Sequence, residues 1–255
     1  MSCDLPRVRR MAPRFFFPSP LAAGIEVALP PSAAHHAAQV LRLKRGDALT
    51  LFDGAGGEYG AQVVDASSRA VDVVVTEHSL IERESPFEVT LVQALIASER
   101  MDQVVQKAVE LGAVAIAPVA TARSVTRLDP DRARRRVEHW RQIVVASCEQ
   151  CGRNRLPVVH APCELGDWLT RTTPDSHTGS RLLLAPSATA ALGQFVPTAS
   201  TEILIGPEGG LSPEEERAAL AAGFRAVRLG PRILRTETAG PAMLAAMNAL
   251  WGDWR

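Results

Sequence analysis

From residue 86 onward, strand-like and helix-like segments alternate along the chain, and this alternation constrains the fold more than any other feature. Short apolar runs of this kind are typical of buried strands, and they occur at 89–96, 114–119, 181–185, 202–205 and 226–229. Helical patterns occur at 99–111, 129–150, 213–222 and, rich in Ala, Met and Leu, at 241–251. Such alternation indicates a parallel sheet covered by helices. We therefore predict an α/β domain over residues 86–255.

The region before residue 86 has a different pattern. Short β-like runs at 47–52, 59–65 and 70–77 are separated by glycine-rich and serine-rich turns, a spacing that favours a small barrel. The basic stretch LRLKRGD (41–47) lies at the first of these runs, where an RNA backbone would find positive charge. We predict a β-rich domain over residues 14–82, preceded by a flexible basic segment at 1–13.

Composition narrows the class of protein. The 255 residues are 46% hydrophobic and 22% charged, which indicates a globular chain. The net charge is zero, so the chain as a whole has no positive field that would attract a polyanion. Residues 121–160 nevertheless hold nine arginines against four acids, which predicts either a phosphate-binding surface or a solvated helix face. Four cysteines without a secretory signal favour the reducing cytoplasm. No apolar run approaches the ~20 residues of a membrane span, so no membrane partner is expected.

Two loops rich in glycine and proline follow predicted strands near the end of the chain. They read ILIGPEGG (203–210) and LGPRILRTETAG (229–240), and bare backbone in such loops can approach a ligand closely. The first loop runs into a helix start with Ser212 as cap, Pro213 at the first position and Glu215 three residues beyond the cap. Glutamates at 208, 214, 215 and 216 would repel a pyrophosphate. A cationic or uncharged ligand fits these loops better.

GPEGGLSPEE (206–215) and LGPRILRTETA (229–239) resemble the RsmE family of ribosomal RNA uridine-N3 methyltransferases, in the SPOUT class. RFFF (14–17), LRLKRGD, ERMDQVVQKAVELG (99–112) and EQCGRN (149–154) extend the likeness over most of the chain. The resemblance implies a PUA-like β-barrel that binds RNA, followed by a SPOUT α/β domain with a deep trefoil knot formed by loops 184–188, 205–211 and 229–235. It further implies S-adenosylmethionine as cofactor, a homodimer, and one uridine in the decoding region of the assembled small ribosomal subunit as target.

Site residues follow from this resemblance together with the chemistry of the loops. Methylation of uracil N3 leaves negative charge on the ring oxygens, so Arg235 is predicted to stabilise that anion and Glu237 to accept the proton or to anchor Arg235. The predicted cofactor-binding residues are Leu184, Pro186, Ile205, Gly206, Pro207, Glu208, Gly210, Leu229, Gly230, Ile233 and Leu234. The predicted RNA-binding residues are Arg14, Arg42, Lys44, Arg45, Lys107, Arg123, Arg127 and Arg153.

A structural role for the same residues is the competing interpretation. Arg235 and Glu237 would then form a pair that pins the start of the last helix, with Thr236 or Thr238 as its cap. Because proline is tolerated only in the first turn of a helix, the Gly240–Pro241 step predicts that this helix begins late. Lys107 would be an ordinary partner of Glu110.

Other functions are weaker matches to the sequence. Cys148 and Cys151 form a CxxC near His139 and His160, but a second CxxC is missing and no metal is expected. The turn after the strand at 89–96 lacks the GxGxxG of a dinucleotide-dependent oxidoreductase. A non-catalytic RNA-binding factor for ribosome assembly, or a SPOUT methyltransferase that acts on another RNA, remains as an alternative. DNA is not an expected partner.

Overall fold

The computed structural model describes residues 12–67, 70–125, 129–171, 179–196 and 198–254. The chain forms two compact units, one of residues 1–83 with 152–155 and the other of residues 84–151 with 156–255. The predicted flexible segment at 1–13 falls almost wholly outside the described residues. Residues 152–155 cluster with the first unit. The predicted domain ranges 14–82 and 86–255 place them in the second domain instead.

The first unit is a five-stranded sheet with the strand order β1-β3-β4-β5-β2. Strands β3, β4 and β5 confirm the three runs predicted from the sequence and pair antiparallel, whereas β1 pairs parallel with β3. The two edge strands, and the helical turns between β2 and β3, were not predicted. The bounds are β1 Arg14–Phe16, β2 Glu26–Ala28, α1 Pro31–His35, the π-helical turn η1 His36–Val40, β3 Ala48–Phe52, β4 Glu58–Ala66 and β5 Val71–Ser79.

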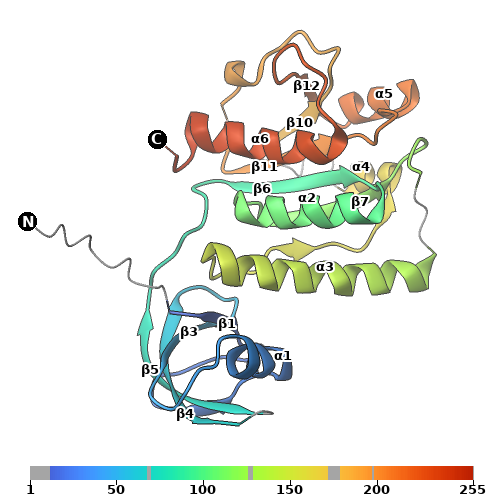
Figure 1. The fold of residues 1–255 in the computed structure, drawn as a ribbon. Coiled ribbons are helices and arrows are strands. Elements are labelled where there is room, and N and C mark those ends of the chain that lie inside the picture. The colour runs from blue at the N-terminus through green and yellow to red at the C-terminus, as the bar shows by residue number, and fades with distance from the viewer. Residues whose placement is uncertain (1–11, 68–69, 126–128, 172–178, 197, 255) are drawn as a thin grey trace, which may run out of the picture. The chain divides into compact units, whose positions relative to one another are not determined.

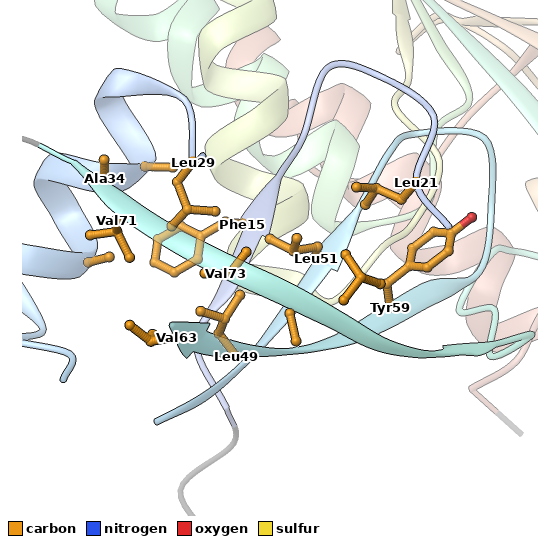
Figure 2. Close-up of a cluster of buried hydrophobic side chains, with 14 residues drawn as sticks. Phe15, Leu21, Leu29, Ala34, Leu49, Leu51, Tyr59, Val63, Val71 and Val73 are labelled. Carbon is orange, nitrogen blue, oxygen red and sulfur yellow. The ribbon is translucent and has the colours of Figure 1, made fainter. Parts of the chain in front are cut away.

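Alternate side chains of these strands build the core of the first unit. Leu49 and Leu51 on β3 and Val71 and Val73 on β5 point to the same buried layer, as the two-residue period of a strand requires. Figure 2 shows these side chains meeting Phe15 between the strands. The layer fixes the register of the sheet, because a shift by one residue would expose the whole apolar set.

The second unit contains a seven-stranded parallel sheet, as the alternating pattern predicted. Its order is β12-β10-β11-β6-β7-β8, and β9 also pairs with β7. The short strands β8 and β9 were missed by the sequence prediction. The bounds are β6 Glu88–Ala94, β7 Ala115–Ala120, β8 Val158–Val159, β9 Cys163–Glu164, β10 Ser180–Leu184, β11 Ser200–Ile205 and β12 Arg225–Val227.

Helices cover both faces of this sheet. Trp168 of α4 and Ala219 of α5 share a buried cluster with Val92 of β6, whereas Leu91 and Gln93 on the opposite face of β6 lie against Gly240 of α6. Helices α2 and α6 pack together, and α3 packs on α2 (Figure 1). The bounds are α2 Ser98–Glu110, α3 Pro130–Cys151, α4 Leu165–Arg171, η2 Leu192–Gln194, α5 Pro213–Ala221 and α6 Thr236–Trp251. No helix of the described ranges is long and apolar enough to cross a bilayer.

The last helix begins earlier than its sequence predicted. Helix α6 starts at Thr236, and Pro241 lies inside it, in its second turn. A proline at that position has no N–H to donate to the carbonyl of Glu237, and it costs about 3 kcal/mol in a helix interior. The burial of Met243, Leu244 and Met247 against the rest of the unit offsets this cost. The prediction of a late start, from the rule for prolines in helices, was therefore wrong.

Candidate active site

A cavity of about 510 Å³ lies at the carboxyl ends of β10, β11 and β12. This is the edge of a parallel sheet at which α/β proteins bind ligands. All eleven predicted cofactor-binding residues line the cavity, and so do Arg235 and Glu237. Ten further residues line the cavity, and four of them, Ala185, Ser187, Leu211 and Arg232, lie within the predicted loops 184–188, 205–211 and 229–235. The other six, which the prediction missed, are Arg100, Leu183, Glu216, Arg228, Thr236 and Ala239. The structure thus brings together segments that are up to 139 positions apart, from Arg100 to Ala239.

Backbone geometry explains the glycines of the 205–211 loop. An added Cβ at Gly206 would lie 3.2 Å from the backbone nitrogen of Leu211, so a side chain there would push the loop open. Gly210 has φ +67°, and its N–H donates to the carbonyl of Pro207 over 2.9 Å. Both positions favour glycine, one by close approach and the other by its left-handed backbone.

The start of α5 is capped as the sequence predicted. The Ser212 hydroxyl accepts from the N–H of Glu215 at 3.2 Å, and the Glu215 carboxylate accepts from the N–H of Ser212 at 2.8 Å. The other Glu215 oxygen accepts from the N–H of Ala122 at 2.7 Å. Glu215 therefore holds the loop after β7 against the start of α5, and its charge is already used within the fold.

Arg123 contacts the same loop from the segment after β7. Its guanidinium Nη1 donates to the carbonyls of Gly209 at 2.7 Å and Leu211 at 3.2 Å. The side chain is exposed, yet its hydrogen bonds go to the predicted cofactor loop. The predicted RNA contact thus has a local structural role in this structure.

Arg100 is the main charged residue that the sequence prediction missed. Its Nη1 lies 3.1 Å from Oε1 of Glu208, and its Nε lies 3.9 Å from Oε1 of Glu237. The other oxygen of Glu237 is buried and has no hydrogen-bond partner among the described residues. Arg100 sits in the first turn of α2, and no spacing in the sequence links it to carboxylates more than a hundred positions away.

The predicted structural pairing of Arg235 with Glu237 does not form. Glu237 faces Arg100 instead, and Arg235 is exposed, with no acidic partner in the described part of the chain. Neither threonine caps α6 with its side chain. The Thr236 hydroxyl donates to the carbonyl of Gly206 at 2.7 Å, and Thr238 is exposed. That alternative was therefore wrong, and the Arg235 guanidinium is open to a ligand.

Apart from Arg123, the predicted RNA-binding residues differ in their exposure and partners. Arg42, Lys44 and Arg45 are exposed together before β3, which suits contact with phosphates. Lys107 is held by Glu110 over 2.8 Å, as the alternative interpretation predicted. Arg127 lies outside the described residues.

Two of the predicted RNA-binding residues, Arg14 and Arg153, are buried. The Arg14 side chain is 6% exposed and forms an ion pair with Glu58 at 2.6 Å. It also donates to Asn154 Oδ1 at 2.7 Å. Arg153 is 3% exposed. Both arginines are structural residues of the first unit, because buried guanidinium groups need their acceptors for stability.

The CxxC does not extend to a metal-binding cluster. Cys148 is buried on α3, and no group of three or more metal-ligating side chains occurs among the residues that the structure describes. The ring Nε2 of His139 lies 2.9 Å from Asp102 Oδ2 of α2. Burial lowers the pKa of His160 and raises the pKa of the Cys163 thiol, which favours the neutral form of each.

Comparison with known proteins places this geometry in a family. The family model for an RNA methyltransferase domain matches residues 83–248, and that for an RNA methyltransferase PUA domain matches residues 29–76. A ribosomal RNA small subunit methyltransferase E of Buchnera aphidicola is 30% identical over 96% of this chain and 99% of its own. That of Synechocystis is 34% identical over 88% of this chain and 73% of its own.

Solved structures give the same result. A ribosomal RNA small subunit methyltransferase E from Neisseria gonorrhoeae, bound to S-adenosyl methionine, matches with a TM-score of 0.89 and 36% identity over 96% of this chain and 100% of that one. A methyltransferase from Legionella pneumophila, in complex with the same cofactor, matches with a TM-score of 0.88 and 34% identity over 95% of this chain and 99% of that one. The chain thus combines a PUA-like unit with an α/β RNA methyltransferase unit, and it belongs to the family of ribosomal RNA small subunit methyltransferases E.

Proposed function

We propose that the protein transfers a methyl group from S-adenosylmethionine to N3 of a uridine in small-subunit ribosomal RNA, within the decoding region of the assembled subunit. The observation that carries the proposal is the cavity at the carboxyl edge of the sheet, where three loops meet Arg235 and Glu237. The related enzymes are named for small-subunit ribosomal RNA, and the Neisseria gonorrhoeae structure is bound to S-adenosyl methionine. The atom and the nucleotide follow from the resemblance of the two loops.

The residues of the cavity suit this cofactor. Leu184, Leu229 and Leu234 offer apolar surface for an adenine ring, and the backbone of Ile205 and Gly206 offers polar groups for its edge. Glu208 and Glu237 bring carboxylates to the same cavity, which favours a ligand with a positive centre. The buried, unpartnered oxygen of Glu237 is unfavourable until a cation or a donor approaches it. When bound, S-adenosylmethionine supplies an electrophilic methyl group on a positive sulfonium.

Arg235 and Glu237 then divide the work on the uracil. Loss of the N3 proton leaves negative charge on the two ring oxygens, and the Arg235 guanidinium stabilises that charge. Glu237 accepts the proton at its unpartnered Oε2. Arg100 holds the other oxygen of Glu237 toward α2, so that the carboxylate keeps one orientation.

The remaining parts of the proposal concern RNA and assembly. Arg42, Lys44 and Arg45 contact the RNA backbone from the PUA-like unit. The exposed apolar side chains of Ile233, Leu250 and Trp254 support a homodimer that covers them. The three loops form the deep trefoil knot of the SPOUT class. The enzyme works in the cytoplasm, where its substrate is assembled.

The test is labelled methyl transfer to small ribosomal subunits that lack their own modification, followed by mass analysis of the nucleosides. We expect 3-methyluridine with the wild-type protein and its loss with Arg235→Ala. An Arg235→Ala variant that folds, binds the cofactor and methylates at a normal rate would remove Arg235 from the mechanism. Cofactor binding without labelled RNA would favour a non-catalytic RNA-binding role or another RNA substrate.

A further inference from the structure

A buried hydrogen-bond chain runs from the centre of the sheet to the first loop of the cavity. Gln93 on β6 is fully buried, and its Nε2 donates to the Thr236 Oγ1 at 3.1 Å and to the Ala94 carbonyl at 3.2 Å. Thr236 is 5% exposed, and its hydroxyl donates to the Gly206 carbonyl at 2.7 Å. Two side chains thus connect β6, the first residue of α6 and the loop after β11.

The chain of bonds has one direction. A hydroxyl has a single hydrogen, so Thr236 must accept from Gln93 if it donates to the Gly206 carbonyl. If the Gln93 amide were flipped, its Oε1 would face both the Ala94 carbonyl and the Thr236 hydroxyl oxygen. The Thr236 hydroxyl could not donate to Oε1, because its one hydrogen goes to the Gly206 carbonyl. The orientation found satisfies the Ala94 carbonyl, the Thr236 hydroxyl and the Gly206 carbonyl, and it leaves Oε1 of Gln93 without a partner among the described residues. The Gln93 amide therefore fixes the direction in which the Thr236 hydroxyl donates.

Close packing of α6 on β6 makes the link between Gln93 and Thr236 possible. Gly240 is buried, and an added Cβ there would lie 3.2 Å from Leu91 and 3.4 Å from Gln93 Oε1. The missing side chain lets the first turns of α6 approach the strand. Thr236 consequently sits at a fixed height above β6, within reach of the Gly206 carbonyl.

We propose that Gln93 and Thr236 are positioning residues that hold Gly206 and the 205–211 loop in the conformation that binds cofactor. The inference rests on the proposed function, since it concerns the same cavity. Thr236 and Gly206 line that cavity, whereas Gln93 is not among its described lining residues. Gln93 is also the register neighbour of the lining residue Ile205 on β11, so the double variant decides whether its effect on the ligand passes through Thr236. The expected consequence is on cofactor affinity, because a preorganised loop loses less freedom on binding.

The experiment compares Thr236→Val and Gln93→Leu with the wild type and with Thr238→Val as matched control, because Thr238 is exposed on the same helix and does not line the cavity. Calorimetry measures the affinity for S-adenosylmethionine, and steady-state kinetics separates KM from kcat. We expect Thr236→Val to weaken binding about tenfold, which corresponds to about 1.4 kcal/mol. The KM for cofactor should rise with kcat nearly unchanged. Thr236→Ser, which keeps the hydroxyl, should restore affinity.

The double variant tests whether the two residues act in series. Gln93→Leu should weaken binding in the same direction, and the double variant should be no weaker than Thr236→Val alone. Additive losses, or a Thr236→Val protein that binds like Thr238→Val, would overturn the inference. If Thr236→Val fails to fold, Gln93→Leu alone decides, and wild-type affinity in it would count against the chain.

A second measurement separates this inference from the proposed function. Hydrogen exchange at residues 206–211 reads the position of the loop without any ligand, and it should be faster in Thr236→Val than in Thr238→Val. A wild-type protein that does not bind S-adenosylmethionine would refute the proposed function and, with it, the cofactor role of the chain. Unchanged exchange in Thr236→Val would refute the positioning role itself, whatever the ligand.

Discussion

A buried ion pair in the second unit offers a quantitative test of how the sheet is stabilised. Arg181 on β10 and Glu202 on β11 are register neighbours, and their side chains are 4% and 6% exposed. Their Nε and Oε2 atoms lie 3.2 Å apart, but the alignment makes no hydrogen bond between them. Arg181 Nη1 donates to the Ala222 carbonyl at 2.6 Å, and the guanidinium lies 5.3 Å from the centre of the Phe224 ring. The pair is therefore buried but incompletely hydrogen-bonded.

Removal of one partner should be far worse than removal of both. Glu202→Gln leaves a buried guanidinium without its counter-charge, which costs about 3–5 kcal/mol. For a unit of this size that corresponds to a loss of at least about 6 °C in Tm. The double variant Arg181→Met with Glu202→Leu replaces two poorly satisfied charges by apolar groups, and it should lie within about 2 °C of the wild type.

Thermal and urea unfolding of the four proteins measures this difference, with Glu164→Gln on β9 as the exposed control. The control should unfold like the wild type, since exposed carboxylates contribute little. The reasoning fails if Glu202→Gln unfolds within 2 °C of the control, because the charge would then be solvated or paired elsewhere. It also fails if the double variant is as unstable as the single one, because packing rather than charge would then explain the loss.

Three further predictions concern the residues around the cavity. Arg100→Met should lower kcat/KM about tenfold by releasing Glu237, which methyl-transfer kinetics would measure. The Tm in melting curves should stay within about 2 °C of the wild type, because ion pairs this exposed contribute only ~0.2–1 kcal/mol. Arg123→Ala removes both hydrogen bonds to the loop carbonyls and should weaken cofactor binding severalfold in calorimetry. Burial, and then the charge of Arg171, hold the pKa of His160 below its usual value. The unfolded chain therefore takes up the proton first, and stability should fall as the pH drops below about 6.5; in His160→Gln the difference in Tm between pH 8 and pH 5.5 should be smaller.

The sequence predicted those parts of the fold that depend on local pattern. Five of the seven strands of the parallel sheet follow from short apolar runs, and the capping box at Ser212 follows from residues three positions apart. Loops that close a ligand cavity were recognised because glycine and proline are required there for backbone reasons. In each case the residues that determine the local structure lie within a few positions of one another, so a single sequence is enough to recognise them.

Long-range pairing was beyond the sequence. Arg14 was predicted to bind RNA, but Glu58 and Asn154, which lie 44 and 140 positions away, bury it. Arg100 was overlooked for the same reason. Helix α6 was misjudged because the cost of a single proline is local, whereas the burial that offsets it comes from the whole unit. A basic side chain therefore cannot be assigned to RNA or to the fold until its acceptors are known.

The charges of the cavity show how this changes the interpretation of the ligand. From the sequence, the glutamates of the 208–216 segment predict a negative loop that repels phosphates. In the fold, Glu208 is paired with Arg100, and the Glu215 carboxylate accepts from the N–H groups of Ser212 and Ala122. The cavity itself is lined by four arginines and three glutamates. Its net charge therefore cannot select a cation, and selectivity for a positive sulfonium must come from where individual carboxylates lie. Oε2 of Glu237 is the one buried side-chain acceptor of this cavity without a partner among the described residues. Under the proposed function, we therefore expect the discrimination between the methyl donor and its neutral product to depend on Arg100, the arginine that orients this carboxylate.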